Sequence, residues 1–175
     1  DSTGLNDAHL IGNPAWLPTD GYVDGTIELD GVDDAIITPF VLNPARGPFS
    51  VLAWIKGGAP GQTLVSKAGG ANWLSATAQE GNLMTELTGS GRRGGPLMSQ
   101  TVITDGDWHR IGLVWDGLHR WLYVDGAVAS HGQQPSGLWD ATAGLNIGAG
   151  QDLEAGTYWS GLIDDVRIYN RAVMP

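Results

Sequence analysis

The stretch at residues 107–126 reads DWHRIGLVWDGLHRWLYVDG and contains two strand signals joined by a tight turn. Trp108–Trp115 and Arg120–Asp125 flank the pair Asp116-Gly117, and a second pair, Asp125-Gly126, turns the chain into a further short strand. Asp-Gly pairs suit two-residue hairpin turns because these residues accept the positive φ angles that such turns require. The stretch therefore predicts antiparallel strands joined as hairpins.

Similar strand signals recur about every ten residues on both sides of this stretch. They occur at Gly25–Asp30, Ala35–Pro39, Phe49–Lys56, Thr63–Lys67, Trp73–Ala78, Leu83–Thr88, Leu145–Ala149 and Tyr158–Tyr169. Phe49–Lys56 carries apolar residues on both faces, which predicts a strand covered on both sides. No window carries a helical apolar stripe, and Leu138–Ala143 forms at most one helical turn. The pattern predicts an all-β fold, a two-sheet antiparallel β-sandwich, as a single domain over residues 1–175.

The composition narrows the classes of partner. The chain has 9 Lys and Arg against 19 Asp and Glu, for a net charge of −10. It lacks the basic stripe that nucleic-acid binding requires, so we expect no nucleic-acid partner. No apolar run approaches the ~20 residues of a membrane span, so no membrane insertion is expected. The absence of cysteine excludes disulfides and thiolate metal sites.

Eight tryptophans in 175 residues exceed what a core of this size needs. Trp54 and Trp108 lie within strand signals, which predicts core positions. Others lie near turns or on a strand face that is presented outward, where a ring can stack on the apolar face of a sugar. The predicted ligand-binding residues are Trp73, Trp121, Tyr123, Trp139, Trp159 and Arg92. The alternative for each tryptophan is that it fills a gap in the core.

Several stretches together resemble one known family. Residues 107–126 resemble a hairpin signature in which a Trp-His strand leads through Asp-Gly into Leu-Tyr-Val-Asp-Gly. Residues 29–34 (LDGVDD), 49–56 (FSVLAWIK) and 161–172 (GLIDDVRIYNRA) resemble further elements in the same order, and residues 1–7 (DSTGLND) resemble the loop after the first strand. The sequence is similar to the laminin-G-like jelly rolls of the concanavalin A-like lectin and glucanase superfamily over nearly its whole length.

The resemblance implies a jelly-roll recognition module, often with bound calcium, attached to larger secreted or cell-surface proteins. Members bind glycans or proteins, so the fold does not decide the ligand. We expect a non-catalytic carbohydrate-binding module that works beside other domains of a parent protein. The alternative is a protein-interaction, adhesion or structural module. The family's usual first strand, which pairs with the C-terminal strand, is absent from the chain. This absence predicts either a strand supplied by another segment or an open edge.

Glu28, Asp30 and Asp33 are the candidate carboxylates for an enzymatic function. Glucanases with this fold carry Glu-x-Asp-x-x-Glu on one strand, where the two glutamates act as nucleophile and acid. Here Gly31 interrupts the strand and the acid position holds Asp33 in a turn signal. The sequence therefore predicts no catalysis.

Acidic clusters supply the oxygen ligands that calcium prefers. The candidate ligands are Asp1, Asn6, Asp30, Asp34 and Asp164, since the resemblance brings the N-terminal loop toward Asp164. Strict alternation from Val166 and Ile168 would point Asp164 into the core, where a carboxylate needs a cation or several donors. The alternative is that Asp164 accepts backbone N–H groups and caps a loop.

Overall fold

The computed structural model describes residues 4, 6–87, 95–133, 138 and 142–175, and within these residues the strands form two seven-stranded antiparallel sheets. Sheet 1 has the order β1 (His9–Ile11), β4 (Ala35–Ile37), β13 (Leu145–Ile147), β6 (Thr63–Lys67), β7 (Asn72–Ala76), β8 (Asn82–Thr85), β9 (Leu97–Val102). Sheet 2 has the order β12 (Ala127–Gln133), β11 (His119–Val124), β10 (Trp108–Trp115), β5 (Phe49–Gly57), β14 (Ser160–Tyr169), β3 (Thr26–Asp30), β2 (Ala15–Leu17). One 3₁₀ turn, η1 (Pro44–Arg46), precedes β5. The predicted all-β sandwich is confirmed.

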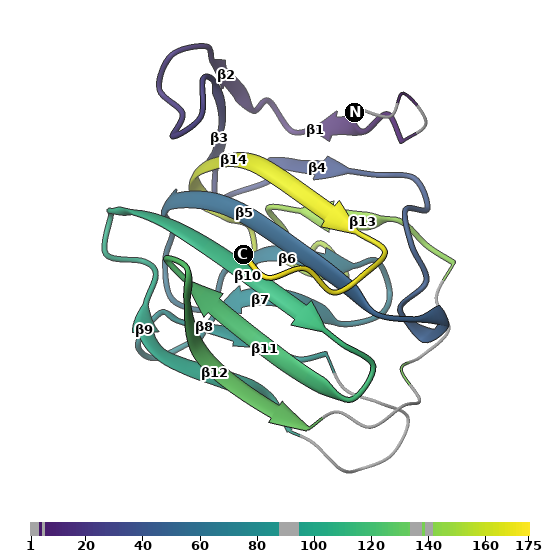
Figure 1. Ribbon diagram of the computed structural model, residues 1–175. Coiled ribbons are helices and arrows are strands. Elements are labelled where there is room, and N and C mark those ends of the chain that lie inside the picture. Colours follow the sequence, from purple (N-terminus) through teal and green to yellow (C-terminus); the bar gives the residue numbers. More distant parts are fainter. Residues whose placement is uncertain (1–3, 5, 88–94, 134–137, 139–141) are drawn as a thin grey trace.

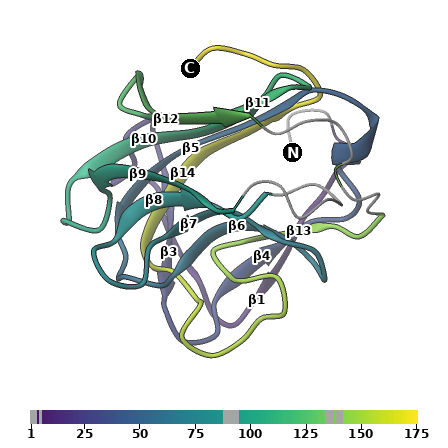
Figure 2. The ribbon, with the colours of Figure 1, turned by 90° about the horizontal axis from the view of Figure 1, so that it is seen from below.

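Figure 1 looks onto sheet 2, with β5, β10, β11, β12 and β14 in front of the strands of sheet 1. Figure 2, turned by 90°, shows the two sheets as separate layers. In the described part of the chain, no helix is long and apolar enough to cross a membrane.

The core lies between the sheets and is built from strict alternation along the central strands of sheet 2. On β5, Phe49, Val51, Ala53 and Ile55 belong to the main apolar cluster. The residues between them therefore face outward. Strand β10 pairs with β5 over its whole length and repeats this division. The outer face of sheet 2 is thus defined by every second residue of β5, β10 and β11.

A bulge interrupts the alternation in β14. Pairing with β5 runs through Asp164 and resumes at Arg167, and Asp165 takes a left-handed backbone angle, φ 46°. Ile163 before the bulge and Val166 after it both pack on the core. Asp164 lies opposite the outward-facing Trp54, so it shares the outer face. The expectation that Asp164 points into the core is therefore wrong, because the extra residue of a bulge shifts the phase of the strand.

The C-terminal half of β14 has one paired edge among the described residues. Ser160–Ile163 pairs with β3 on one side, and Arg167–Tyr169 pairs only with β5 on the other. The single domain with a missing first strand stays a prediction, and this edge is where such a strand would pair.

The C-terminal residues turn back across the outer face of sheet 2 (Figure 1). Ser50 Oγ donates to the carbonyl of Arg171 and accepts from the N–H of Val173, both at 2.9 Å. Gly112 leaves room for this segment, since a Cβ there would lie 2.7 Å from Leu52 Cδ2 and 3.4 Å from Pro175 Cγ. One end of the outer face is therefore covered by the chain itself.

Candidate functional site

The other end of the outer face carries a loop, residues 18–25, which joins β2 to β3. Its turn is closed by the N–H of Gly21, which donates to the carbonyl of Asp24 at 3.1 Å. Asp164 anchors it, because its Oδ2 accepts the N–H of Val23 at 2.7 Å. Gly21 is required by close approach, since a Cβ there would lie 2.9 Å from Asp164 Oδ2 and 2.8 Å from backbone atoms of Gly25. The sequence offered the alternative that Asp164 accepts backbone N–H groups and caps a loop. The bond from the N–H of Val23 agrees with that alternative.

The anchored loop places Tyr22 on two outward-facing tryptophans. The Tyr22 ring is stacked on Trp54, with centroids 3.5 Å apart and planes 14° apart. Its centroid lies 6.1 Å from that of Trp108, with the two rings edge to face. Tyr22 is 54% exposed and both tryptophans are partly exposed. We call Tyr22, Trp54 and Trp108 the aromatic patch. The prediction that Trp54 and Trp108 are core residues is wrong, because both lie on the outward phase of their strands.

Two cations lie beside the rings. In the β10–β5 register, Arg110 is opposite Trp54 and Lys56 is opposite Trp108. Directly opposite residues in an antiparallel pair have Cβ atoms roughly 5 Å apart on the same face. The patch therefore combines three aromatic rings and two long basic side chains on a pair of neighbouring strands.

A second aromatic group lies on the same face, around Trp121. Its ring is stacked on His131, with centroids 4.9 Å apart, and meets His119 edge to face at 6.0 Å. Its Nε1 donates to Asp116 Oδ2 at 3.3 Å. Trp121 thus faces outward and is partly exposed, as the sequence predicts, but neighbouring rings already contact it.

Three of the predicted ligand-binding aromatics are buried. Trp73 and Trp159 are 1% and 0% exposed within the core cluster. Tyr123 faces outward but is 8% exposed, because it lies beside Gly112 where the C-terminal segment crosses. A ring enclosed by protein has no face on which a sugar can stack, so these three are withdrawn as ligand-binding residues. Trp139 and Arg92 lie outside the described residues.

The acidic residues divide between two places. Asp30, Asp33 and Asp34 offer carboxylate oxygens within 4.8 Å of one another. Asp34 is buried and accepts the N–H groups of Asn13 and Asp30, while Asp30 Oδ1 accepts those of Val32 and Asp33. The N–H of Val32, with that of Asp33, holds the pKa of Asp30 below its usual value. Several of the carboxylate oxygens in this cluster therefore already accept hydrogen bonds from nearby backbone N–H groups.

The predicted single calcium site does not form as expected. Asp30 is opposite Ser160 on β14, four residues before Asp164, which corresponds to about 13 Å along an extended strand. Asp164 is instead engaged by the Tyr22 loop. Asn6 lines a different cavity, beside Asp165 and Arg167. Asp1 lies outside the described residues. The predicted set is wrong as a single centre, because the bulge and the loop separate its members.

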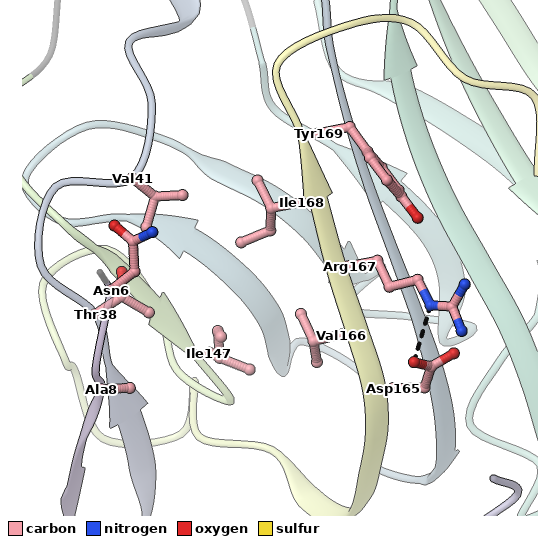
Figure 3. Close-up of a pocket in the computed structure, with 10 residues that line it drawn as sticks. All are labelled: Asn6, Ala8, Thr38, Val41, Ile147, Asp165, Val166, Arg167, Ile168 and Tyr169. Carbon is pink, nitrogen blue, oxygen red and sulfur yellow. Dashed lines mark hydrogen bonds and ion pairs between the residues drawn. The ribbon is translucent and has the colours of Figure 1, made fainter. Parts of the chain in front are cut away.

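That cavity has a volume of about 730 Å³ and lies between the open edge of β14 and the strands of sheet 1 (Figure 3). Its walls are the C-terminal half of β14 on one side and residues of the N-terminal segment, β13 and the chain after β4 on the other. Ile168 and Val166 point into it, whereas Arg167 turns away and donates from Nε to Asp165 Oδ1 at 2.9 Å. Five of its ten described lining residues are apolar, and the aromatic one among the ten, Tyr169, points to the same side of β14 as Arg167, away from Val41 and Ile147 (Figure 3).

The carboxylates considered for glucanase chemistry do not form a matched pair. Glu28 is exposed on the outer face of β3, opposite Leu162. Asp30 is held by the N–H groups of its own turn, and Asp33 lies beyond the end of the strand. An acid and a nucleophile must flank one glycosidic bond, which a single strand achieves only if it continues regularly. The turn at Gly31 (φ 77°) ends that strand.

The two paired sheets define a β-sandwich of the concanavalin A-like type. The chain belongs to the concanavalin A-like lectin/glucanases superfamily, whose laminin-G model matches residues 30–175. The resemblance found in the sequence is thereby confirmed. No protein with curated annotation matches the chain.

Solved structures of similar fold include several binding domains. The binding domain of Paraclostridial Mosquitocidal Protein 1 matches with a TM-score of 0.77 and 17% identity, over 96% of this chain and 45% of that domain. The binding domain of Botulinum Neurotoxin DC, in complex with SialylT, gives 0.72 and 14%, over 96% and 44%. Domain 4 of AbnA, an extracellular arabinanase from Geobacillus stearothermophilus in complex with arabinotriose, gives 0.64 and 19%, over 96% and 83%.

These likenesses, at identities below 20%, establish a shared fold. The chain spans less than half of the two toxin domains, so a ligand of those domains need not touch the matched part. The arabinanase domain is covered over most of its length and is therefore the more informative comparison.

Proposed function

We propose that this chain is a non-catalytic carbohydrate-binding module whose ligand lies on the outer face of sheet 2, over the aromatic patch. The stacked pair of Tyr22 and Trp54, with Trp108 beside it, carries the proposal. Trp54 and Trp108 lie on paired strands, Tyr22 lies on the loop that Asp164 anchors, and all three rings are partly solvent-exposed. A sugar ring needs such an exposed aromatic face in order to stack. Preorganised aromatic surface lowers the entropy cost of binding.

The comparisons support the sugar ligand. The arabinanase domain was solved with arabinotriose, and one of the toxin domains was solved with SialylT. A module of this kind concentrates a partner domain on a polysaccharide without cleaving it. A secreted or cell-surface setting, and attachment to other domains of a parent protein, belong to the same proposal.

A glycan array on the purified domain, followed by calorimetry on the best ligand, tests the proposal. Tyr22→Ala should weaken binding at least tenfold, and Tyr22→Phe should retain it because the ring remains. Phe40→Ala is the matched control: Phe40 is 48% exposed, but it follows β4 of sheet 1. Equal losses in Tyr22→Ala and Phe40→Ala would contradict the assignment of the site.

The absence of catalysis has its own test. Incubation with β-glucans should release no reducing sugar. Release that disappears in Glu28→Gln would show a glycosidase instead.

We further propose that calcium, if the chain binds it, lies at Asp30, Asp33 and Asp34. Calcium takes six to eight oxygen ligands, and this is the one group of three carboxylates brought together among the described residues. The fit is partial, because backbone N–H groups already occupy several of the oxygens. Binding to the native state alone raises stability by about 2.7 kcal/mol at a hundredfold excess over Kd. Calcium should raise the Tm of the metal-free chain, and Asp33→Asn should remove that rise.

The edge of β14 that has no partner strand among the described residues favours a second candidate function, a protein-interaction module. Such an edge, beside a cavity that Val166 and Ile168 enter, accepts an extended peptide as an added strand. Val166→Lys and Ile168→Lys would block such pairing and leave glycan binding intact. Loss of partner binding in these variants, with no glycan bound by the wild type, would favour this alternative.

A further inference from the structure

We infer that the aromatic patch selects glycans that carry an acidic group, with Lys56 and Arg110 as the residues that bind the acid. The inference rests on the proposed function and adds the chemical class of the ligand. It follows from how these two cations are placed and from what they do not contact.

Neither cation is used by the fold. Within the described ranges, the side chains of Lys56 and Arg110 form no hydrogen bond and no ion pair. Arg167, by contrast, forms an ion pair with Asp165. Other basic side chains on this face do have partners, since Arg171 lies over the Tyr169 ring at 5.4 Å. Two unpaired cations on one patch are notable in a chain whose net charge is −10.

The carboxylates around the two cations form no ion pair with them in the described part of the chain. Asp125 lies beside Arg110, but its Oδ1 accepts the backbone N–H of Arg110 and its Oδ2 contacts His109 Nδ1, both at 2.9 Å. In the row that crosses β3, β14 and β5, Glu28 is opposite Leu162, and Leu162 is opposite Lys56. Two strand spacings, about 10 Å, therefore separate Glu28 from Lys56. Asp164, in the next row, is buried beneath the Tyr22 loop and accepts the N–H of Val23. The ammonium of Lys56 and the guanidinium of Arg110 thus remain without an ion-pair partner, although the loop of Tyr22 also carries the exposed Asp20 and Asp24.

The two cations can reach one ligand group together. Lys56 is opposite Trp108, and Arg110 is two residues further along the same neighbouring strand. Such diagonal neighbours lie about 7–8 Å apart, which two long side chains span easily. A guanidinium pairs with a carboxylate or sulfate through two parallel hydrogen bonds, and an ammonium adds a mobile point charge. A sugar stacked on the rings would present its acidic substituent between them.

The test uses pairs of oligosaccharides that differ only in charge: oligouronates against their methyl esters, and sulfated oligosaccharides against their desulfated forms. We expect the acidic member of at least one pair to bind about tenfold more tightly than its neutral partner. Lys56→Gln and Arg110→Gln should each remove most of that preference, because the acidic member should lose more affinity than the neutral member. Arg46→Gln, in the exposed η1 turn, removes the same charge at a distance and should change neither.

The outcomes separate this inference from the proposed function. Equal affinity within every pair, or a preference that survives in both glutamine variants, overturns the inference and leaves the carbohydrate-binding module in place. Binding that is confined to neutral glycans also overturns the inference and leaves the carbohydrate-binding module in place. The absence of binding to any glycan overturns both. A preference confined to one set of pairs identifies the acid as carboxylate or as sulfate and supports the inference.

Discussion

Along β5, Val51, Ala53 and Ile55 face sheet 1, whereas Leu52, Trp54 and Lys56 face outward. The inner set is fully enclosed by apolar side chains from both sheets. The outer set is covered unevenly, because the C-terminal segment lies over Leu52 and the Tyr22 loop lies only partly over Trp54. One strand thus carries a face that stabilises the fold and a face that leaves rings and charges accessible. The difference predicts which substitutions damage stability and which damage binding.

Ile55→Ala should give the largest loss of stability. The side chain is 0% exposed in the main cluster, and Ile→Ala in a packed core costs about 2–5 kcal/mol. Denaturant unfolding measures the loss, and the glycan affinity of the molecules that remain folded should be unchanged. A loss below about 1 kcal/mol would mean that the inner face is not close-packed.

Asp164→Ala should follow, with a loss of about 1–3 kcal/mol from the unpaired N–H of Val23 and the released loop. The loss should be the same with calcium and with EDTA, because Asp164 caps a loop. Glycan binding should also weaken, since the loop carries Tyr22. A Tm that depends on calcium in the wild type and not in this variant would restore Asp164 as a metal ligand.

Tyr22→Leu should cost about 0.5–1.5 kcal/mol for each of the two ring contacts that it removes, with Trp54 and with Trp108. Its effect on glycan binding should nevertheless exceed that of Ile55→Ala. If Ile55→Ala weakens glycan binding more than Tyr22→Leu does, binding depends on overall stability. That result would contradict the division of β5 into a stabilising face and a binding face.

The smallest expected effect is the pH dependence of stability that comes from His109. This residue lies on β10 opposite Ile55, on the face of the sheet that points to the core. Burial opposes its charge, but the hydrogen bonds that its ring N–H groups donate to Asp125 and Asp105, at 2.9 and 3.1 Å, outweigh burial and raise its pKa above the usual 6.5. A raised pKa in the folded state stabilises the fold fully below the unfolded pKa, and this contribution is lost as pH rises through the folded value. NMR titration of the ring should show the raised pKa. Between pH 6 and 9, His109→Gln should flatten the decline of Tm.

Local patterns in the sequence predicted most of the fold. The Asp-Gly pairs at 116–117 and 125–126 lie at the two turns that join β10, β11 and β12. The apolar residues on both faces of Phe49–Lys56 predicted a doubly covered strand, and β5 is covered by sheet 1 on one face and by chain segments on the other. The short edge strands β1 and β2, and the largely exposed β9, were not predicted, because they carry little apolar alternation.

The site could not be predicted in the same way. The contact between Val23 and Asp164 joins residues 141 positions apart, and no local pattern encodes it. The bulge at Asp165 reversed the face assigned to Asp164, since alternation alone contains no signal for an extra residue. One signal for the site is present in the sequence. Trp54 and Trp108 lie at an odd number of positions from the core residues Ile55 and Ile111 on the same strands, so alternation points them to the opposite face. That alternation places both tryptophans on the outer face.

The tryptophan indole N–H signals in a ¹H–¹⁵N spectrum, recorded during titration with the best glycan from the array, test the central claim most directly. Each of the eight indoles gives one signal, and single Trp→Phe variants assign them. The account predicts that the signals of Trp54 and Trp108 shift together and saturate with the calorimetric Kd, while those of Trp73 and Trp159 stay fixed. Saturable shifts confined to Trp121 or Trp16, with Trp54 and Trp108 unmoved, would contradict it.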